Sequence, residues 1–111
     1  PEVFRRMAAQ GTQLYTVIAN WPAARRERWI TLLRARAIEN QAYVIGVNRC
    51  GSDPNLEYAG DSMIIDPRGE VMAHANSTEG VIEAQVDMSL LVEYRQSFPA
   101  LFDMRSEFCS W

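Results

Sequence analysis

Residues 13–50, QLYTVIANWPAARRERWITLLRARAIENQAYVIGVNRC, decide the fold class because a strand, a helix and a second strand follow one another there. The segments 13–20 and 42–50 are short, rich in β-branched residues and almost continuously apolar, as strands covered on both faces are. Between them a helix is expected from about residue 23, with one apolar stripe made by Trp29, Ile30, Leu33, Ala37 and Ile38. Strands joined by a helical crossover run parallel in one sheet, so the pattern predicts an α/β fold.

The flanking sequence adds shorter elements. Apolar residues between 3 and 8 recur at helical spacing before Gly11, which indicates a short helix that ends at the glycine. Residues 51–60 are rich in turn formers and are expected to be a loop. Beyond them the pattern predicts a hairpin with strands 62–66 and 70–75, a strand at 80–87, a helix at 89–98 capped by Ser89 or Asp87, and a tail from residue 99 to 111.

Composition excludes several classes of protein. A chain of 111 residues with 48% apolar residues suits one globular domain. The net charge of −3 and the pI of about 5.1 do not favour nucleic acid as a partner. The apolar runs are too short for a membrane span, and no secretory signal is visible, so a cytoplasmic protein is expected. Cys50 and Cys109 could pair, but free thiols are the expected state in that compartment.

Few residues offer catalytic chemistry. His74 is the only histidine and is expected as an ordinary hairpin residue, with a Cys50–His74 pair as the catalytic alternative. The basic run Arg25, Arg26 and Arg28 is expected to be a solvated helix face, or else to recognise a carboxylate or form an ion pair at an interface. Glu39 and Asn40 end the long helix, where they would form a local polar network or orient a loop of an active site or interface.

Several motifs in order carry a family resemblance. They are Asn20-Trp21-Pro22, residues 34–41 (RARAIENQ), residues 46–49 (GVNR), Gly60-Asp61-Ser62 and residues 66–69 (DPRG). With these motifs the chain resembles the carbon–nitrogen hydrolase (nitrilase) superfamily, and within it the bacterial omega-amidase branch, from Pro1 to about Phe102. The resemblance implies that residues 1–111, with a tail at about 99–111, are the C-terminal part of an α-β-β-α sandwich with a mixed sheet and flanking helices.

The resemblance also implies a reaction. Omega-amides of 2-oxo acids would be hydrolysed through a cysteine thioester by a Glu-Lys-Cys triad, without a metal or organic cofactor. In the family the nucleophile lies a few residues before the segment that matches Pro1-Glu2, and these 111 residues contain no lysine. No catalytic residue is therefore expected within this chain, which alone should be inactive. The alternatives are a non-enzymatic half-sandwich that binds or assembles, and an amidase of another branch, such as a carbamoylase or glutaminase.

The expected substrate contacts lie at the end of the first strand. Trp21 is predicted to line the substrate pocket and the Asn20 segment to supply backbone polar contacts; the alternative for Trp21 is core packing. Cys50 is interpreted as a small residue that closes a buried strand. The expected partners are a small amide and the missing N-terminal half or a second copy of the chain, which would cover open strand edges and apolar faces. The interface candidates are the helix at 25–41 and the aromatic tail, and no nucleic-acid or membrane partner is expected.

Overall fold

A mixed four-stranded sheet forms the centre of the chain. The computed structural model describes residues 1–109. The strands lie in the order β1-β2-β5-β6, with β1 at Leu14–Ala19, β2 at Tyr43–Asn48, β5 at Met63–Ile65 and β6 at Val71–His74. β1 and β2 pair in parallel, whereas β5 is antiparallel to both of its neighbours. The predicted parallel pair, the hairpin and the α/β class are confirmed.

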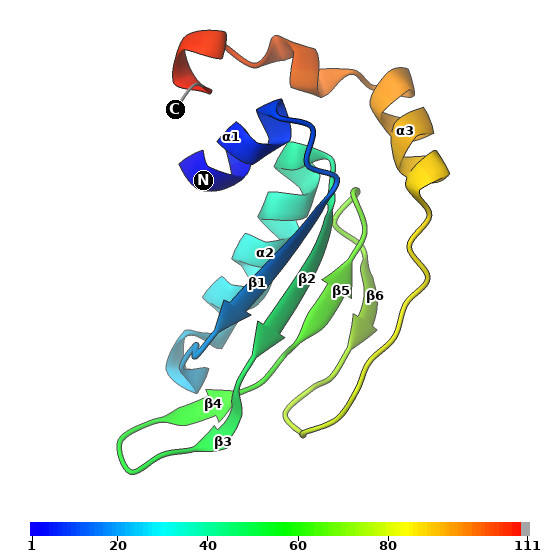
Figure 1. Cartoon of the computed structure of the whole chain (residues 1–111). Helices are drawn as coiled ribbons and strands as arrows, with labels where there is room; N and C mark the ends of the chain where they lie inside the picture. The colour runs from blue at the N-terminus through cyan, green and yellow to red at the C-terminus, as the bar shows by residue number, and fades with distance from the viewer. Residues whose placement is uncertain (110–111) are drawn as a thin grey trace.

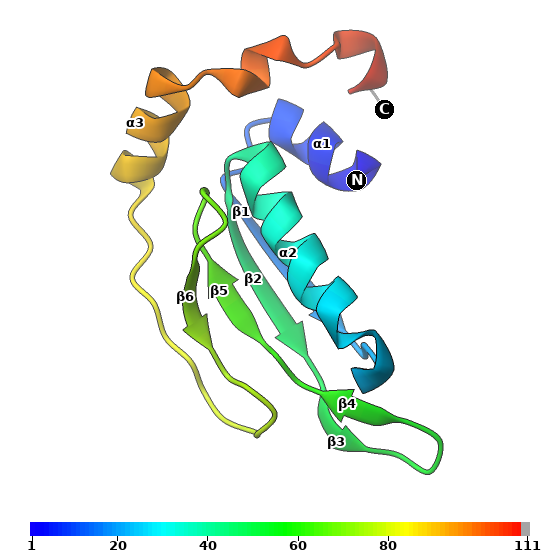
Figure 2. The ribbon, with the colours of Figure 1, turned by 180° about the vertical axis from the view of Figure 1, so that it is seen from behind.

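The crossover helix covers one face of this sheet. A short 3₁₀ helix, η1 (Ala23–Arg25), leads into α2 (Arg26–Asn40), which lies over β1 and beside β2 on one side of the sheet (Figure 2). The core between helix and sheet consists of Tyr15, Trp29, Leu33, Ala37, Ala42, Val44, Met63 and Ile65. Three members of the predicted stripe are thus buried, but Ile38 is half-exposed and contacts the β5–β6 turn.

One glycine allows α2 to lie close to the sheet. A Cβ atom at Gly46 in β2 would stand 2.3 Å from Cδ1 of Leu33 and 3.1 Å from Cζ2 of Trp29. Both distances are shorter than an ordinary van der Waals contact, so the helix approaches the strand where no side chain intervenes. The first residue of the family-like motif GVNR therefore has a packing role.

The remaining helices lie at one end of the sheet (Figure 1). They are α1 (Glu2–Ala9), α3 (Met88–Ser97) and two 3₁₀ turns in the tail, η2 (Ala100–Asp103) and η3 (Ser106–Phe108). The carboxylate of Asp87 accepts hydrogen bonds from the backbone N–H groups of Ser89 and Leu90, so Asp87 is the N-cap of α3. Of the two predicted caps, Asp87 is the one observed.

Residues 51–60 are not the predicted loop. They form most of a hairpin of two short strands, β3 (Cys50–Ser52) and β4 (Glu57–Ala59), which projects from the end of the sheet (Figure 1). Asp53 closes its turn, because the carboxylate accepts from the N–H groups of Asn55 and Leu56 and from the hydroxyl of Tyr58. The same turn formers that indicate a loop also allow a tight hairpin.

The predicted strand at 80–87 is absent from the described part of the chain. The segment is extended and its exposure alternates, with Ile82, Ala84 and Val86 half-buried, while Val81 is 88% exposed. A strand requires a hydrogen-bonded neighbour, and the hydrogen bonds recorded for this segment join only Asp87, to the hydroxyl of Tyr43 and to the first turn of α3. The period-2 prediction was right about side-chain direction and wrong about pairing.

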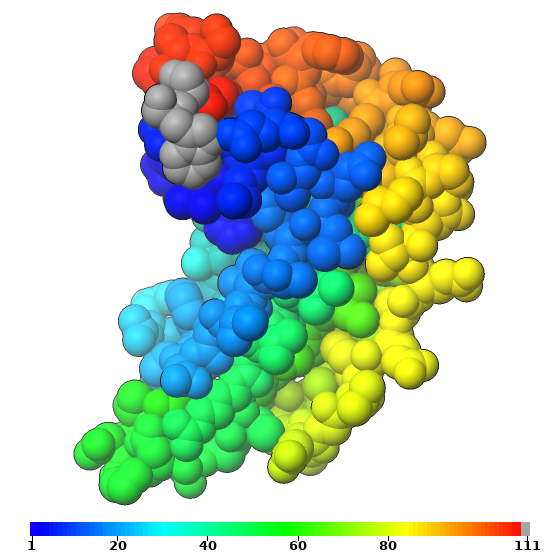
Figure 3. Space-filling view, viewed as in Figure 1, coloured from blue at the N-terminus to red at the C-terminus, as the bar shows by residue number. Residues whose placement is uncertain are grey.

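The face of the sheet opposite α2 is open. Ile18 and Val47 are register partners of β1 and β2, lie on that face, and are 83% and 48% exposed. No helix crosses this face in Figure 1, and Figure 3 shows the same side in space-filling form. The strands predicted to be covered on both faces are covered on one within this chain.

Candidate functional site at the carboxyl ends of β1 and β2

Asn48, the last residue of β2, ties the end of β1 to the β4–β5 connection. Its Oδ1 accepts from the backbone N–H of Trp21 at 2.7 Å, and its Nδ2 donates to the carbonyl oxygens of Trp21 at 3.2 Å and Gly60 at 2.9 Å. The Asn48 side chain is buried, so these contacts are shielded from water. Because the side-chain amide bonds both polar groups of the Trp21 backbone, it holds the segment that follows β1 as a neighbouring strand would.

Ser62 completes this arrangement from β5's side. Its Oγ accepts from the backbone N–H of Asn48 at 2.9 Å and donates to the Asn48 carbonyl at 3.3 Å. The motif Gly60-Asp61-Ser62 and the motif ending in Asn48 are therefore two halves of one hydrogen-bonded unit. The sequence interpretation treated them only as family markers; the available signal was a polar amide within an otherwise apolar strand pattern.

Asp61 is the second centre of the cluster. Its carboxylate accepts from Nε of Arg26 at 2.6 Å and from Nη2 at 3.2 Å, and it contacts Nε2 of His74 at 2.7 Å. Its backbone carbonyl accepts from Nε1 of Trp29 at 2.9 Å, and its N–H donates to the carbonyl of Asn76 at 2.7 Å. Asp61 thereby joins the start of α2, the end of β6 and the turn before β5.

The conformation and charge of Asp61 are unusual for a buried residue. Its φ is +55°, a left-handed conformation that aspartate tolerates better than most residues, and it is 1% exposed. Burial alone would raise the pKa of the carboxyl group. The hydrogen bonds and positive charges of Arg26 and His74 outweigh burial and bring the pKa of Asp61 below its usual value. The group is therefore a carboxylate at neutral pH.

The contacts of Asp61 decide between the alternative roles predicted for the basic run and for His74. Arg26 is half-exposed but binds the Asp61 carboxylate in a two-pronged contact, so one member of the run recognises a carboxylate within the chain. Arg25 stacks over the Trp21 ring at 5.7 Å. His74 is a hairpin residue as predicted, and its hydrogen-bond partner is Asp61 rather than Cys50.

Trp21 and Asn20, the predicted substrate contacts, lie at this end of the sheet in different environments. Asn20 is exposed, whereas Trp21 is half-buried and packs against Trp29 with ring centroids 5.9 Å apart. Nε1 of Trp21 donates to the carbonyl of Arg25 at 2.7 Å, so its ring is held on the α2 side of the sheet. The geometry includes the core packing named as the alternative, and the role of both residues in substrate binding stays a prediction.

Cys50 does not close β2 as the sequence suggested. β2 ends at Asn48, and Cys50 opens β3, where it is half-buried and pairs with Ala59. Both Cys50 and Cys109 are free thiols. The strand ends two residues earlier than predicted. At this point the N–H and carbonyl of Trp21 are hydrogen-bonded to the side chain of Asn48 rather than to the backbone of a continued β2.

Glu39 and Asn40 form the local polar network that was one of their two predicted roles. Glu39 pairs with Arg36 on the same helix and lies 4.0 Å from a guanidinium nitrogen of Arg5 in α1. Nδ2 of Asn40 donates to the carbonyl of Arg36 at 2.9 Å. Both residues lie at the C-terminal end of α2, far from the polar cluster around Asp61.

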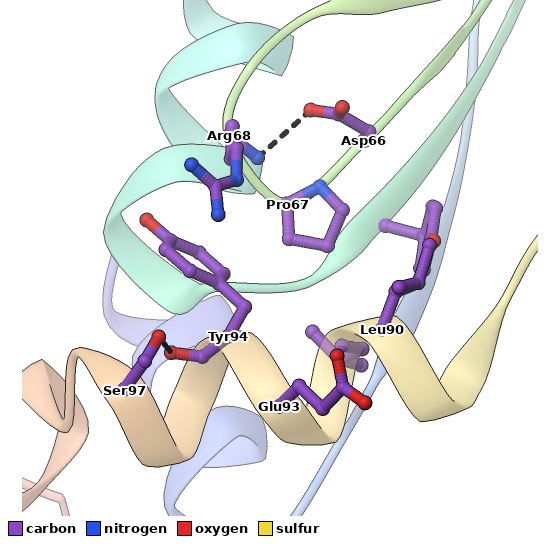
Figure 4. Close-up of a pocket in the computed structure, with 9 residues that line it drawn as sticks. Asp66, Pro67, Arg68, Leu90, Glu93, Tyr94 and Ser97 are labelled. Atoms are coloured by element: carbon purple, nitrogen blue, oxygen red, sulfur yellow. Dashed lines mark hydrogen bonds between the residues drawn. The ribbon is translucent and has the colours of Figure 1, made fainter.

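A cavity of about 340 Å³ lies at the opposite end of the sheet, between the β5–β6 turn and α3 (Figure 4). Arg68 in the turn stacks over the Tyr94 ring at 4.5 Å. The Asp66 carboxylate accepts from the N–H groups of Arg68 and Glu70 within its own turn. These polar groups of the cavity therefore already have partners within the chain.

The fold and the cluster define a class of protein. A parallel strand pair with a crossover helix, and polar residues gathered where the parallel strands end, are typical of α/β proteins that bind small ligands at that edge. Comparison with protein families narrows the class. Residues 1–96 match the family model of the carbon-nitrogen hydrolases, and the chain belongs to this family.

Individual relatives agree with the omega-amidase branch. A 2-oxoglutaramate amidase of Paenarthrobacter nicotinovorans is 43% identical over 107 residues, covering 96% of this chain and 36% of the relative. The omega-amidase YafV of Escherichia coli K12 is 52% identical over 96 residues, covering 85% of this chain and 37% of the relative. The chain thus spans less than half the length of these curated relatives.

A solved structure supports the fold. The CN-hydrolase superfamily protein XC1258 of Xanthomonas campestris superposes with a TM-score of 0.81 and 46% sequence identity, over 84% of this chain and 36% of that protein. Its structure carries an arsenic adduct in its active site. The predicted mixed sheet with flanking helices of a nitrilase-like fold is confirmed.

Membrane-spanning helices and metal-binding clusters are both absent from the described residues, 1–109. None of their helices is both long and apolar enough to cross a bilayer. Within the same residues, no three histidine, cysteine, aspartate or glutamate side chains are grouped so that they could hold a metal ion.

Proposed function

We propose that this chain is part of an amidase that hydrolyses small omega-amides of 2-oxo acids. The observation that carries the proposal is the similarity, over nearly the whole chain, to relatives named 2-oxoglutaramate amidase and omega-amidase. The described polar cluster fits this role, because it holds the backbone beyond β1 rigidly at the edge where a small polar substrate would bind.

The chemistry would come from residues outside these 111. A cysteine thiolate would attack the amide carbon, a glutamate would transfer protons, a lysine would stabilise the oxyanion, and water would hydrolyse the thioester after ammonia leaves. The absence of lysine from the sequence supports this division. The chain alone would therefore be inactive, and it would supply one wall of the pocket through Asn20 and Trp21.

The open face and edges suggest what completes the fold. Ile18 and Val47 expose apolar surface on one face, β1 is an edge strand, and the extended segment 80–87 has the side-chain alternation of a strand that lacks a neighbour. We therefore propose that further sheet, from an N-terminal half or a second copy, packs here. Sedimentation of the isolated chain tests this, and a well-behaved dilute monomer would contradict it.

Activity is tested by comparing the complete gene product with residues 1–111 alone. The expected result is ammonia release from 2-oxoglutaramate by the complete protein and none by the short chain. A complete protein that hydrolyses only a carbamoyl or glutamine substrate would favour another branch of the family. Absence of hydrolysis with every amide would favour a binding or assembly module. In the complete protein, unchanged kinetics after Trp21→Ala would contradict the pocket role of Trp21.

A further inference from the structure

The hydrogen bonds around Asp61 and those around Asn48 form two groups that meet at one turn of the backbone. The turn at Gly60 and Asp61 connects them, because the Gly60 carbonyl accepts from Nδ2 of Asn48 while the Asp61 carboxylate binds Arg26 and His74. Asn48 then holds both backbone polar groups of Trp21. A displacement of the turn would therefore reach the Trp21 backbone through a single side chain.

We infer that Asp61 is a positioning residue which, through the Gly60 carbonyl and the Asn48 side chain, sets the backbone of the Asn20–Trp21 segment. The inference rests on the proposed function, since it assigns a purpose to the segment that would line the substrate pocket. Asp61 lies on the α2 side of the sheet and is buried, so it acts through Asn48 rather than by touching substrate.

Other contacts also hold the turn: the N–H of Gly60 donates to the carbonyl of Arg49, and Oγ of Ser62 bonds both backbone polar groups of Asn48. The Asp61 carboxylate adds the contacts to Arg26 and His74. Gly60 and Asp61 both have positive φ values, +73° and +55°, which leave the turn dependent on the contacts that hold it. A Cβ at Gly60 would stand 2.6 Å from the Asn76 carbonyl, so the turn also lies directly against the end of β6. Arg26, Trp29 and His74 each bind Asp61 by a hydrogen bond. These residues belong to α2 and β6, and neither element has a recorded hydrogen bond to Asn48.

The charge of Asp61 gives the turn a fixed position between two elements. Arg26 belongs to α2 and His74 to β6, and both approach the same carboxylate. An amide in place of the carboxylate would present N–H groups to at least one of these donors, so one contact would be lost while the volume stays the same. Asparagine tolerates positive φ as aspartate does, so Asp61→Asn tests the charge without straining the backbone.

The test uses the complete gene product and a double-mutant cycle. Asp61→Asn and Asn48→Ala should each lower kcat/KM by about 10- to 100-fold, as a small misplacement of a substrate-positioning segment does. The double variant should be no slower than the slower single variant, because both changes act on one path. Losses that multiply in the double variant would overturn the inference.

A matched control comes from the other end of the sheet. Asp66 also accepts backbone hydrogen bonds within a tight turn, but its turn contacts α2 and α3 rather than Asn48. Asp66→Asn should leave kcat/KM unchanged. A loss as large as that of Asp61→Asn would mean that any carboxylate in a tight turn matters, through folding alone, and would overturn the assignment.

A second measurement separates this inference from the proposed function. The N–H of Trp21 donates to Asn48, so its hydrogen exchange should be faster by about tenfold or more in Asp61→Asn, in line with partial opening of one local unit. The N–H of Gly69, bonded to the Asp66 carbonyl, should exchange as before. This readout needs no substrate: an inactive wild-type protein would contradict only the amidase proposal, and unchanged Trp21 exchange would overturn the positioning role. If Asp61→Asn does not fold, Asp61→Gly replaces it in both assays, with formate added because formate can occupy the position of the missing carboxylate. Failure of formate to restore the wild-type kcat/KM and the wild-type exchange of the Trp21 N–H would overturn the inference.

Discussion

Arg95 offers the sharpest prediction about stability. Its guanidinium donates only to backbone carbonyls: Nε to Gln41 at 2.9 Å, and Nη2 to Thr12 at 2.8 Å and to Asn40 at 3.4 Å. One side chain of α3 thus binds the C-terminal end of α2 and the connection before β1. Burial brings the pKa of Arg95 below its usual value, yet the group stays charged and complements the negative end of the α2 dipole.

The magnitude follows from these contacts. Arg95→Met keeps the aliphatic length and removes the donors, and hydrogen bonds to a charged group contribute about 1.5–3 kcal/mol each. Taking the two shorter bonds at the low end, since the side chain is partly exposed, the free energy of unfolding should fall by about 3 kcal/mol. Urea unfolding of the protein that contains this chain, followed by circular dichroism, measures the change.

The matched control is Arg105→Met in the tail. Arg105 is 69% exposed and its hydrogen-bond partner is Glu107, two residues along the chain. Such surface pairs contribute about 0–1 kcal/mol, so the free energy of unfolding should barely change. If Arg95→Met destabilises the protein no more than Arg105→Met does, the bridging role of Arg95 is refuted.

Three further outcomes are expected. Gly46→Ala should lower the free energy of unfolding by about 1–3 kcal/mol, because the added methyl group would overpack against Leu33 and Trp29. Gly80→Ala is the control and should not lower it, since nothing lies within 4 Å of the added carbon. Equal urea midpoints for the two variants would contradict the close approach of α2 to β2. Because the pKa of Asp61 is below its unfolded value, its contribution is present above a pH of about 3.9 and is lost as the pH falls through the folded pKa. Acid titration of stability should therefore be shallower in Asp61→Asn than in wild type, and parallel curves would argue against the charge network. Cys50→Ser should leave the proposed amidase activity of the complete protein intact, since Cys50 opens a peripheral hairpin; loss of a wild-type activity in this variant would reassign the nucleophile.

The fold could be predicted from sequence wherever local pattern and packing agree. The strand–helix–strand unit has strong periodicity, and its parallel pairing follows from the crossover. The strand prediction for residues 80–87 was wrong because the alternation of apolar and polar residues indicates only which side chains face inward. Pairing depends on a neighbouring strand, about which the local pattern carries no information. The hairpin at 50–59 was predicted as a loop for a related reason. Its turn depends on hydrogen bonds to the Asp53 carboxylate, and the composition of such a turn is the same as that of an irregular loop.

The candidate site was harder to predict than the fold. Trp21 and Asn20 were predicted as substrate contacts because they follow a buried strand, and that role stays a prediction. Asn48 and Asp61, which hold that segment, were named only as members of the family motifs. Their role depends on contacts between β2, the β4–β5 connection and α2, residues up to 35 positions apart in the sequence. For Arg26 a solvated face was favoured over recognition of a carboxylate, because its charge is visible in the sequence and its buried partner, Asp61, is not.

The parallel pairing of β1 with β2 has a consequence for synthesis on the ribosome. β1 emerges first, yet its ladder partner in this chain is made only after the whole of α2 has followed, whereas β5 and β6 are joined by one tight turn. At about 5–20 residues per second, β1 waits for a second or more with its apolar side chains uncovered. The nascent chain is therefore most open to chaperones and to wrong strand pairing in that interval. The rate of synthesis sets its length, because α2 itself forms within about a microsecond once its residues are made.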